Sequence, residues 1–285
     1  MNKRLNEKQL KNLHLIVFDL DGTLLNDENK IGTKSIEYIT ALRNIGVRFS
    51  FATGRLHSAI TDHAATLNIQ TPLISLDGSL IKSFPEGKII FNSYVKEKHV
   101  KKAIKLADQL LLKIALCHDE AIYYTEHDAL IPKLLDKFGA EYRQVENFNG
   151  LTDKVLEIVI VGDVRESIKF VASKMIFPYS MGLNTAQYKS QRAAGQYYLE
   201  IRRQGCNKGT GLKRLIKYLK INIEETAVAG DWYNDRSLFD TDALKIAVSN
   251  AVPEILRLAD FVTQKSNNED GVAEFLEYVL KVKTK

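Results

Sequence analysis

Cysteine is scarce in this chain, and the two cysteines lie far apart. They are Cys117 and Cys206, in a sequence of 285 residues. A disulfide framework normally needs more cysteines at regular spacings, and metal-binding cysteines come in close pairs. We therefore expect two reduced thiols, which is typical of a cytoplasmic protein.

Long apolar runs are missing as well. No stretch approaches the ~18 consecutive apolar residues of a membrane helix. The first residues, Met1–Lys8, carry charge with no apolar run behind them, unlike a secretory signal. The sequence also contains no internal repeat and no low-complexity tract. We expect no membrane partner.

Neither sign of charge dominates. The chain has 40 basic and 35 acidic residues, which gives a net charge of +5. This excess is too small to argue for nucleic acid as a partner, although it fits an anionic small molecule. The hydrophobic share of 45% and the charged share of 26% are ordinary for a globular protein.

Apolar periodicity predicts alternating strands and helices at both ends of the chain. At the N-terminal end we expect strands at 14–18, 47–52 and 73–76, with helices at 33–44 and 58–67 between them. The same rhythm returns after Lys208, with helices at 209–219, 235–240, 253–258 and 271–282 and strands at 227–229, 245–248 and 261–262. This order predicts an α/β fold with a doubly wound parallel, Rossmann-like sheet.

The middle of the chain follows a different pattern. Here we expect strands at 88–94, 114–116, 121–124, 155–161 and 196–201, and helices at 97–112, 133–138 and 164–175. Short paired strands interrupted by helices favour an α+β layer. We predict a discontinuous core formed by residues 1–82 and 191–285, with a polar tail at 1–12, and an inserted domain at 83–190.

Two carboxylates follow the first predicted strand. Asp19 and Asp21 lie in the segment Phe18–Thr23, where an apolar run gives way to a turn containing glycine. Ligands of open α/β sheets gather at the carboxyl ends of the strands. Two acids this close repel each other unless a cation or a shared proton relieves them. Mg²⁺, a hard cation that prefers oxygen ligands, is the natural partner.

Three further segments stand beside strand ends or helix starts. Thr53–Arg55 offers a hydroxyl and backbone N–H groups that could cradle a phosphate. Asn207–Gly209 places Lys208 just before a helix, where it can neutralise a phosphoryl group. Gly230–Asp235 follows a short apolar strand and supplies more oxygen ligands. Each segment alone is commonplace, since Asp-Gly, Thr-Gly and Asp-Asn pairs occur in ordinary turns and caps. Their joint order is what carries the prediction.

Together the four segments resemble those of the haloacid dehalogenase (HAD) superfamily of hydrolases. The long middle region looks like the cap of its Cof-type sugar-phosphatase branch, and the resemblance covers nearly the whole chain from about Leu13. The segments Val248–Glu254, Ala259–Thr263 and Asn268–Ala273 are similar to the same branch. The resemblance implies a phosphatase with a catalytic core and a cap that selects the substrate.

The resemblance also implies a mechanism. Asp19 would attack phosphorus to form an aspartyl-phosphate, and Asp21 would act as general acid and then as base. Mg²⁺ would be bound by Asp19, by the backbone carbonyl of Asp21 and by Asp231. The implied catalytic residues are Asp19, Asp21, Thr53 and Lys208. The implied substrate-binding residues are Thr53, Gly54, Arg55, Lys208 and Asn234, with Asn234 and Asp235 supporting the metal and the phosphate.

Two segments depart from the usual pattern of that branch. Leu76–Ser79 stands where Asn-Gly-Ala is common, and Trp232 and Tyr233 replace a frequent Gly-x pair. Neither change removes a catalytic group, but both could alter substrate choice. We interpret Trp232, the single tryptophan, as packing against the inserted domain.

Selection of the leaving group is expected to fall to the inserted domain. Polar and aromatic residues in 117–125 and 182–196 are the candidates, among them His118, Tyr123, Asn184 and Arg192. We favour the interpretation of His118 and Asp119 as a surface pair, and of Tyr123 as a packing residue.

We expect a Mg²⁺-dependent phosphatase acting on small phosphorylated metabolites, with sugar phosphates first. The alternatives are a phosphatase for a cofactor or its precursor, such as pyridoxal phosphate or a flavin-pathway intermediate, and a phosphomutase. A non-catalytic phosphate-ligand sensor is disfavoured, because Asp19, Asp21, Lys208 and Asp231 are all present.

Overall fold

The computed structural model describes residues 5–125, 132, 140–189 and 195–285. Contacts divide this part of the chain into two compact units. The first, here called the core unit, contains residues up to Thr53, residues 61–90 and residues 207–285. The second, here called the insert unit, contains residues 54–60 and 91–206.

A parallel sheet of five strands forms the centre of the core unit. The strand order is β14-β13-β12-β1-β2, and every neighbouring pair is parallel. The strands are β1 (Leu15–Phe18), β2 (Arg48–Phe51), β12 (Thr226–Gly230), β13 (Leu244–Ala247) and β14 (Phe261–Val262). All four residues of β1 are buried, as expected for a central strand covered on both faces. The expected α/β fold class with a parallel sheet is confirmed.

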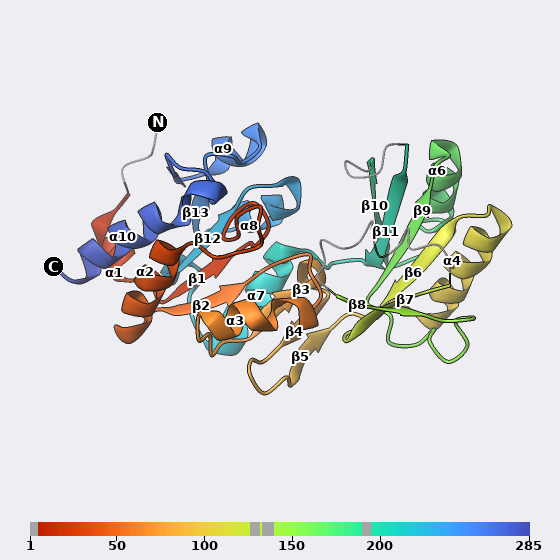
Figure 1. Cartoon of the computed structure of the whole chain (residues 1–285), viewed down its shortest axis with the longest axis horizontal. Coiled ribbons are helices and arrows are strands. Elements are labelled where there is room, and N and C mark those ends of the chain that lie inside the picture. The colour runs from red at the N-terminus through yellow and green to blue at the C-terminus, as the bar shows by residue number, and fades with distance from the viewer. Residues whose placement is uncertain (1–4, 126–131, 133–139, 190–194) are drawn as a thin grey trace. The chain divides into compact units, whose positions relative to one another are not determined.

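Two groups of helices accompany this sheet. The helices of the core unit are α1 (Glu7–Lys11), α2 (Thr33–Asn44), α3 (Thr61–Thr66), α7 (Lys208–Leu219), α8 (Arg236–Phe239), α9 (Pro253–Leu258) and α10 (Val272–Lys283). Helix α10 packs with α1 and α2, whereas α8 packs with α7 and α9 (Figure 1). After β1 the chain crosses to β2 on one side. After β12 it crosses to β13, in the opposite direction along the sheet. Right-handed crossovers therefore put α2 and α8 on opposite faces.

The third strand expected at the N-terminal end, at 73–76, is not a member of the parallel sheet. β3 (Leu73–Ser75) touches the parallel sheet through a single bridge between Ala52 and Ile74, and belongs to a small sheet with β4 (Leu80–Lys82) and β5 (Ile89–Asn92). It pairs with β4 in antiparallel fashion. The reason is the tight turn after Ser75, where Leu76 and Asp77 adopt left-handed conformations and reverse the chain at once.

The insert unit is built on a sheet of six strands, in the order β10-β11-β9-β6-β7-β8. These strands are β6 (Lys113–Cys117), β7 (Ala121–Tyr124), β8 (Glu141–Gln144), β9 (Glu157–Gly162), β10 (Leu183–Lys189) and β11 (Tyr197–Arg203). Alternate residues such as Ile158 and Ile160 join one hydrophobic core with residues of α4 (Glu97–Gln109) and α6 (Arg165–Lys174). The helix expected at 133–138 lies outside the described residues.

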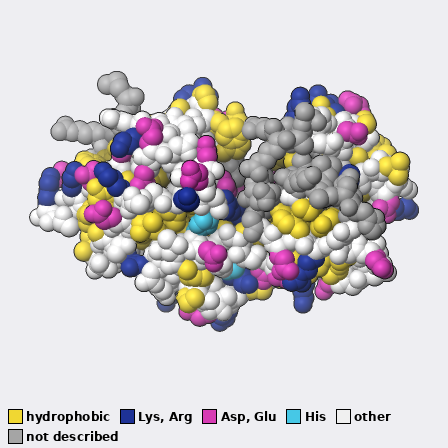
Figure 2. Space-filling view, viewed as in Figure 1, with side chains coloured by type: hydrophobic (Ala, Val, Ile, Leu, Met, Phe, Trp, Pro, Cys, Tyr) yellow, Lys and Arg dark blue, Asp and Glu magenta, His cyan; other side chains and the backbone are white. Residues whose placement is uncertain are grey.

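The surface is mixed in charge. Lys, Arg, Asp and Glu side chains are interspersed over the described part of the face in Figure 2. Within the part of the chain that the structure describes, no helix is both long and apolar enough to cross a membrane. Cys117 and Cys206 are both free and buried.

Candidate active site

The candidate site begins at the carboxyl end of the central strand. Phe18 pairs with Ala229 of β12 on one side and with Phe51 of β2 on the other. The next backbone N–H, that of Asp19, donates to the carbonyl of Ala229 at 2.9 Å. The residues that follow these three strands are thereby fixed at one edge of the sheet. This edge is a topological switch point, where α/β folds bind ligands.

Lys208 reaches into this edge from the first position of α7. The preceding Asn207 caps the helix: its side chain accepts from the backbone N–H of Thr210 at 2.8 Å, and its own N–H donates to Thr210 Oγ1 at 3.1 Å. Such a capping box fixes the start of a helix. Gly78 lies so close to the Asn207 carbonyl that a Cβ there would collide with it, which fixes the helix start against the 76–78 turn.

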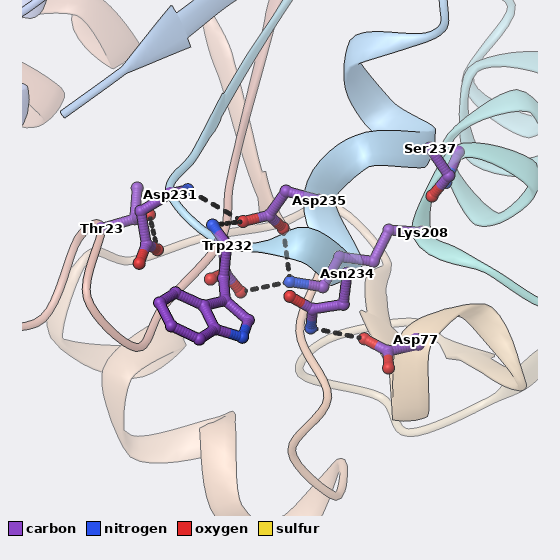
Figure 3. Close-up of polar contacts among 10 residues, drawn as sticks. Thr23, Asp77, Lys208, Asp231, Trp232, Asn234, Asp235 and Ser237 are labelled. Carbon is purple, nitrogen blue, oxygen red and sulfur yellow. Dashed lines mark hydrogen bonds and ion pairs between the residues drawn. The ribbon is translucent and has the colours of Figure 1, made fainter. Parts of the chain in front are cut away.

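The ammonium group of Lys208 is completely buried between two carboxylates. It donates to Asp19 Oδ1 at 2.6 Å and to Asp235 Oδ1 at 2.6 Å. The other oxygen of Asp235 accepts from the backbone N–H groups of Asp231 and Trp232, at 2.9 and 3.1 Å (Figure 3). Asp235 thus ties the third and fourth sequence segments together.

Asp231 is the third carboxylate of this cluster, beside Asp19 and Asp235. Its Oδ1 accepts a hydrogen bond of 2.6 Å from the hydroxyl of Thr23 (Figure 3). Gly22 makes the close approach possible, because a Cβ at this position would lie 2.6 Å from Asp231 Oδ2 and its φ of +78° favours glycine. The sequence pattern predicted no role for Thr23, although this residue lies within the first segment.

The electrostatics show that the cluster lacks positive charge. Burial raises the pKa of Asp19 well above its ordinary value, and the charges of Asp235 and Asp231 add to this, against Lys208. Burial and the charge of Asp235 raise the pKa of Asp231 to about 7. Burial alone would lower the pKa of Lys208, but the charges of Asp19, Asp235 and Asp77 outweigh it and raise that pKa. Three carboxylates therefore share one ammonium group.

A divalent cation fits this donor set. Carboxylate oxygens of Asp19, Asp231 and Asp235 lie within 4.8 Å of one another, the one such cluster among the described residues. Asp235 is already engaged through both oxygens. Asp19 and Asp231 each keep one oxygen that takes no hydrogen bond from the described residues. Hard cations prefer such oxygen ligands, and a bound cation would relieve the raised pKa values.

The other predicted site residues take different positions. Asp21 is exposed, and its charge contributes to the raised pKa of Asp231. Thr53 is buried, and its backbone N–H donates to the Ile74 carbonyl at 3.0 Å. Gly54 and Arg55 belong to the insert unit, where Arg55 is buried.

Asn234 contacts Asp77, a residue that the sequence pattern did not place in the site. Its side-chain N–H donates to Asp77 Oδ1 at 3.2 Å (Figure 3). A carboxylate accepts only, so Asp77 fixes which end of the Asn234 amide faces it. The backbone N–H of Asp77 donates to the Thr53 carbonyl at 2.9 Å, which links the second and fourth segments. The only sequence signal was the departure of Leu76–Ser79 from the family pattern.

We predict different costs for two substitutions at Asp77. Asp77→Ala removes the acceptor for Asn234 and places alanine at a φ of 48°, so the free energy of unfolding should fall by about 1–2 kcal/mol. Asp77→Asn keeps an acceptor oxygen and a residue that tolerates this φ, so its loss should be less than half as large. Urea unfolding of both variants measures the difference. Equal losses would contradict the role of the hydrogen bond.

One interpretation of the sequence is corrected by the structure. His118 is not part of a surface pair: its side chain is buried, Nε2 lies 3.1 Å from the Leu151 carbonyl, and its ring packs edge-on against Tyr123. Burial lowers the pKa of His118. Trp232 leaves 44% of its surface exposed, and its expected packing against the inserted domain stays a prediction. Tyr123 joins the insert core, Asn184 lies on the exposed part of β10, and Arg192 lies outside the described residues.

The parallel sheet and its edge cluster of carboxylates and lysine define a class of α/β hydrolase. The model of the family described as haloacid dehalogenase-like hydrolase matches residues 16–276, and the chain belongs to this family.

Named relatives support the same class of enzyme. The chain is 26% identical to phosphatase YwpJ of Bacillus subtilis, over 94% of this chain and all of that protein. It is 28% identical to 5-amino-6-(5-phospho-D-ribitylamino)uracil phosphatase YwtE of the same species, over 93% of this chain and 97% of that one. A crystal structure of a haloacid dehalogenase-like hydrolase from Bacteroides thetaiotaomicron, 26% identical, aligns with a TM-score of 0.83 and covers 94% of this chain and 99% of that one. The expected family and the expected phosphatase class of enzyme are confirmed.

Proposed function

We propose that this protein is a Mg²⁺-dependent phosphatase that hydrolyses small phosphate monoesters through an aspartyl-phosphate on Asp19. The observation that carries the proposal is that Lys208 donates hydrogen bonds to both Asp19 and Asp235, in the same cluster as Asp231. It supplies a fixed carboxylate nucleophile, a buried positive charge and a set of oxygen ligands within one cluster.

The reaction takes two displacements. Asp19 attacks phosphorus, the bond from phosphorus to the leaving oxygen breaks, and Asp21 gives that oxygen a proton. Water then attacks the phosphoryl group and gives a proton to Asp21, and the bond from phosphorus to Asp19 breaks. Splitting the hydrolysis in this way replaces one difficult step with two easier ones. The exposed position of Asp21 suits an exchange of protons with substrate and water.

Lys208 is suited to hold the transferring group. Two of its three N–H bonds are used by Asp19 and Asp235, and the third meets no acceptor among the described residues. That third donor is available to a phosphoryl oxygen. Thr53 would add a hydroxyl, Gly54 and Arg55 further donors, and Asn234 a contact steered by Asp77.

Asp19, Asp231 and the backbone carbonyl of Asp21 would hold the metal ion, and Asp235 would support it from the side. When bound, the cation neutralises charge on the phosphoryl group, which is the main requirement of phosphoryl transfer. Asp235 accepts from Lys208 and from the backbone N–H groups of Asp231 and Trp232.

The substrate class is the next part of the proposal. Sugar phosphates lead, with residues 83–190 acting as a cap that selects the leaving group. A flavin-precursor phosphate is the second candidate, because relatives such as YwtE are named for one. Free buried thiols at Cys117 and Cys206 fit a cytoplasmic setting for either.

The direct test is release of phosphate from a panel. It contains sugar phosphates, nucleotides, pyridoxal phosphate, the ribitylamino-uracil phosphate and a chromogenic ester, each run with Mg²⁺ and with chelator. The proposal would be supported by phosphate release that requires Mg²⁺ and that differs in rate among the compounds of the panel. A folded protein that releases phosphate from none of them would contradict it.

Metal binding should depend on pH in a defined direction. The pKa of Asp231 is raised to about 7 in the folded protein, so between its ordinary value and 7 the folded state keeps a proton that the unfolded state loses. Without metal, this group makes the protein less stable as the pH rises through that window. Mg²⁺ needs the ionised carboxylate, so its affinity should weaken roughly tenfold for each pH unit below the pKa.

Melting temperatures with and without Mg²⁺ measure this effect. The stabilisation by Mg²⁺ should be small at pH 5.5 and large at pH 8. Asp231→Asn should remove most of it at both values. A stabilisation of equal size at the two pH values would rule out Asp231 as the ligand whose proton competes with the metal.

A further inference from the structure

The loop between Asp231 and Asp235 carries two exposed aromatic rings. Trp232 is 44% exposed and Tyr233 is 56% exposed. Their ring centroids are 5.3 Å apart and the planes are inclined by 74°, an edge-to-face arrangement. In Figure 3 the indole of Trp232 projects from the loop that also carries Asp231 and Asp235.

The backbone beneath these rings is held on both sides. The Trp232 N–H donates to Asp235 Oδ2 at 3.1 Å, and the Trp232 carbonyl accepts from the Asp235 N–H at 2.9 Å. The carbonyl of Asp231 accepts from the Val252 N–H at 2.9 Å. A large, partly exposed aromatic ring, carried on a fixed backbone next to the candidate catalytic carboxylates, is typical of a surface that contacts a ligand.

We propose that Trp232 is a substrate-contacting residue that stacks on a flat, electron-poor ring in the leaving group, such as a pyrimidinedione. This inference rests on the proposed function, since it takes the phosphate at Asp19 as the fixed end of the substrate. It assigns the leaving group to phosphate esters that carry a heterocycle, in preference to simple sugar phosphates.

Charge favours this class of ring. The face of an indole ring is negative. Electron-poor rings with carbonyl and N–H groups stack well on such a face. Tyr233 meets Trp232 edge to face, a contact that favours this orientation of the indole and so reduces the entropy cost of binding.

The experiment uses the fact that Trp232 is the single tryptophan of the chain. Full-length Asp19→Asn protein with Mg²⁺ is titrated with uridine 5′-monophosphate or with ribose 5-phosphate, which has the same sugar phosphate and no pyrimidine base. Tryptophan fluorescence, excited where uracil does not absorb, should be quenched saturably by the nucleotide and not by ribose 5-phosphate.

Hydrolysis by the active enzyme provides the second readout. Trp232→Ala should lower kcat/KM for the nucleotide roughly tenfold, the size of one stacking contact, and leave kcat/KM for ribose 5-phosphate unchanged. Trp232→Phe should restore most of the loss. Tyr218→Ala is the matched control, because Tyr218 is an exposed aromatic residue on α7 of the same unit.

Each outcome decides between the two proposals. Hydrolysis without quenching, with Trp232→Ala lowering both substrates equally, overturns the stacking role and keeps the phosphatase. Quenching with no phosphate release from any member of the panel keeps the stacking role and overturns the phosphatase. A result with neither quenching nor phosphate release from any member of the panel overturns both proposals.

Discussion

Asp19→Asn is expected to abolish phosphate release while leaving the protein folded and able to bind its ligand. An amide cannot act as the nucleophile that the proposed aspartyl-phosphate requires, so kcat should fall by at least about 10³-fold. The side-chain carbonyl of the substituted residue can still accept the hydrogen bond that Lys208 now gives to Asp19 Oδ1. Phosphate release in single-turnover and steady-state assays measures the loss.

The same substitution should not cost stability without metal. The pKa of Asp19 is raised by burial and by the charges of Asp235 and Asp231, so the wild-type carboxylate is held against unfavourable electrostatics. Asp62→Asn, at an exposed position on α3, is the control for loss of one carboxylate. Activity of Asp19→Asn within tenfold of the wild type would exclude Asp19 as the nucleophile.

Lys208→Met is expected to damage both activity and stability. The substitution keeps a long apolar stem but leaves Asp19 and Asp235 buried without their shared cation. Breaking a buried pair by removing one partner typically costs about 3–5 kcal/mol. Loss of the positive charge next to the phosphoryl group should lower kcat by a further ~10²–10³-fold in whatever protein remains folded.

The electrostatic origin of this cost can be separated from simple loss of packing. Lys208 lowers the pKa of Asp19, so without it this buried carboxyl should retain its proton to higher pH, and urea unfolding should show a smaller loss at pH 5 than at pH 8. Adding Asp235→Asn should recover part of the stability and none of the activity. Lys213→Met, on an exposed position of the same helix, should change neither. A stability loss that is the same at both pH values would show that packing, not charge, causes it.

The sequence was sufficient for elements whose signals are local. The helix expected at 33–44 is found at Thr33–Asn44, because its apolar residues recur at helical spacing and Gly46 follows its end. Strands β1 and β12 are short apolar runs, and both are buried in the sheet as the sequence predicted. The position of Asp19 and Asp231 at the ends of these strands follows from the parallel topology alone.

Features that depend on distant contacts were not predicted. β10 has no alternating pattern in its sequence, and it forms because its backbone pairs with β11 along its whole length. The roles of Thr23 and Asp77 depend on Asp231 and Asn234, which lie 208 and 157 positions away along the chain. No local pattern distinguishes such residues from ordinary turn residues.

The pairing of β1 with β12 has a consequence for how the protein is made. Because β12 is encoded near the end of the chain, β1 leaves the ribosome long before its neighbour exists, and one edge of the central strand stays open during synthesis. Contacts this far apart in sequence slow folding, since a large loop must close before they form. Most of the insert unit, residues 91–206, is one continuous stretch that can fold before the last segment of the core unit, residues 207–285, is made. Until β12 is made, Leu15–Phe18 is therefore a hydrophobic strand with an open edge, which is a hazard for aggregation.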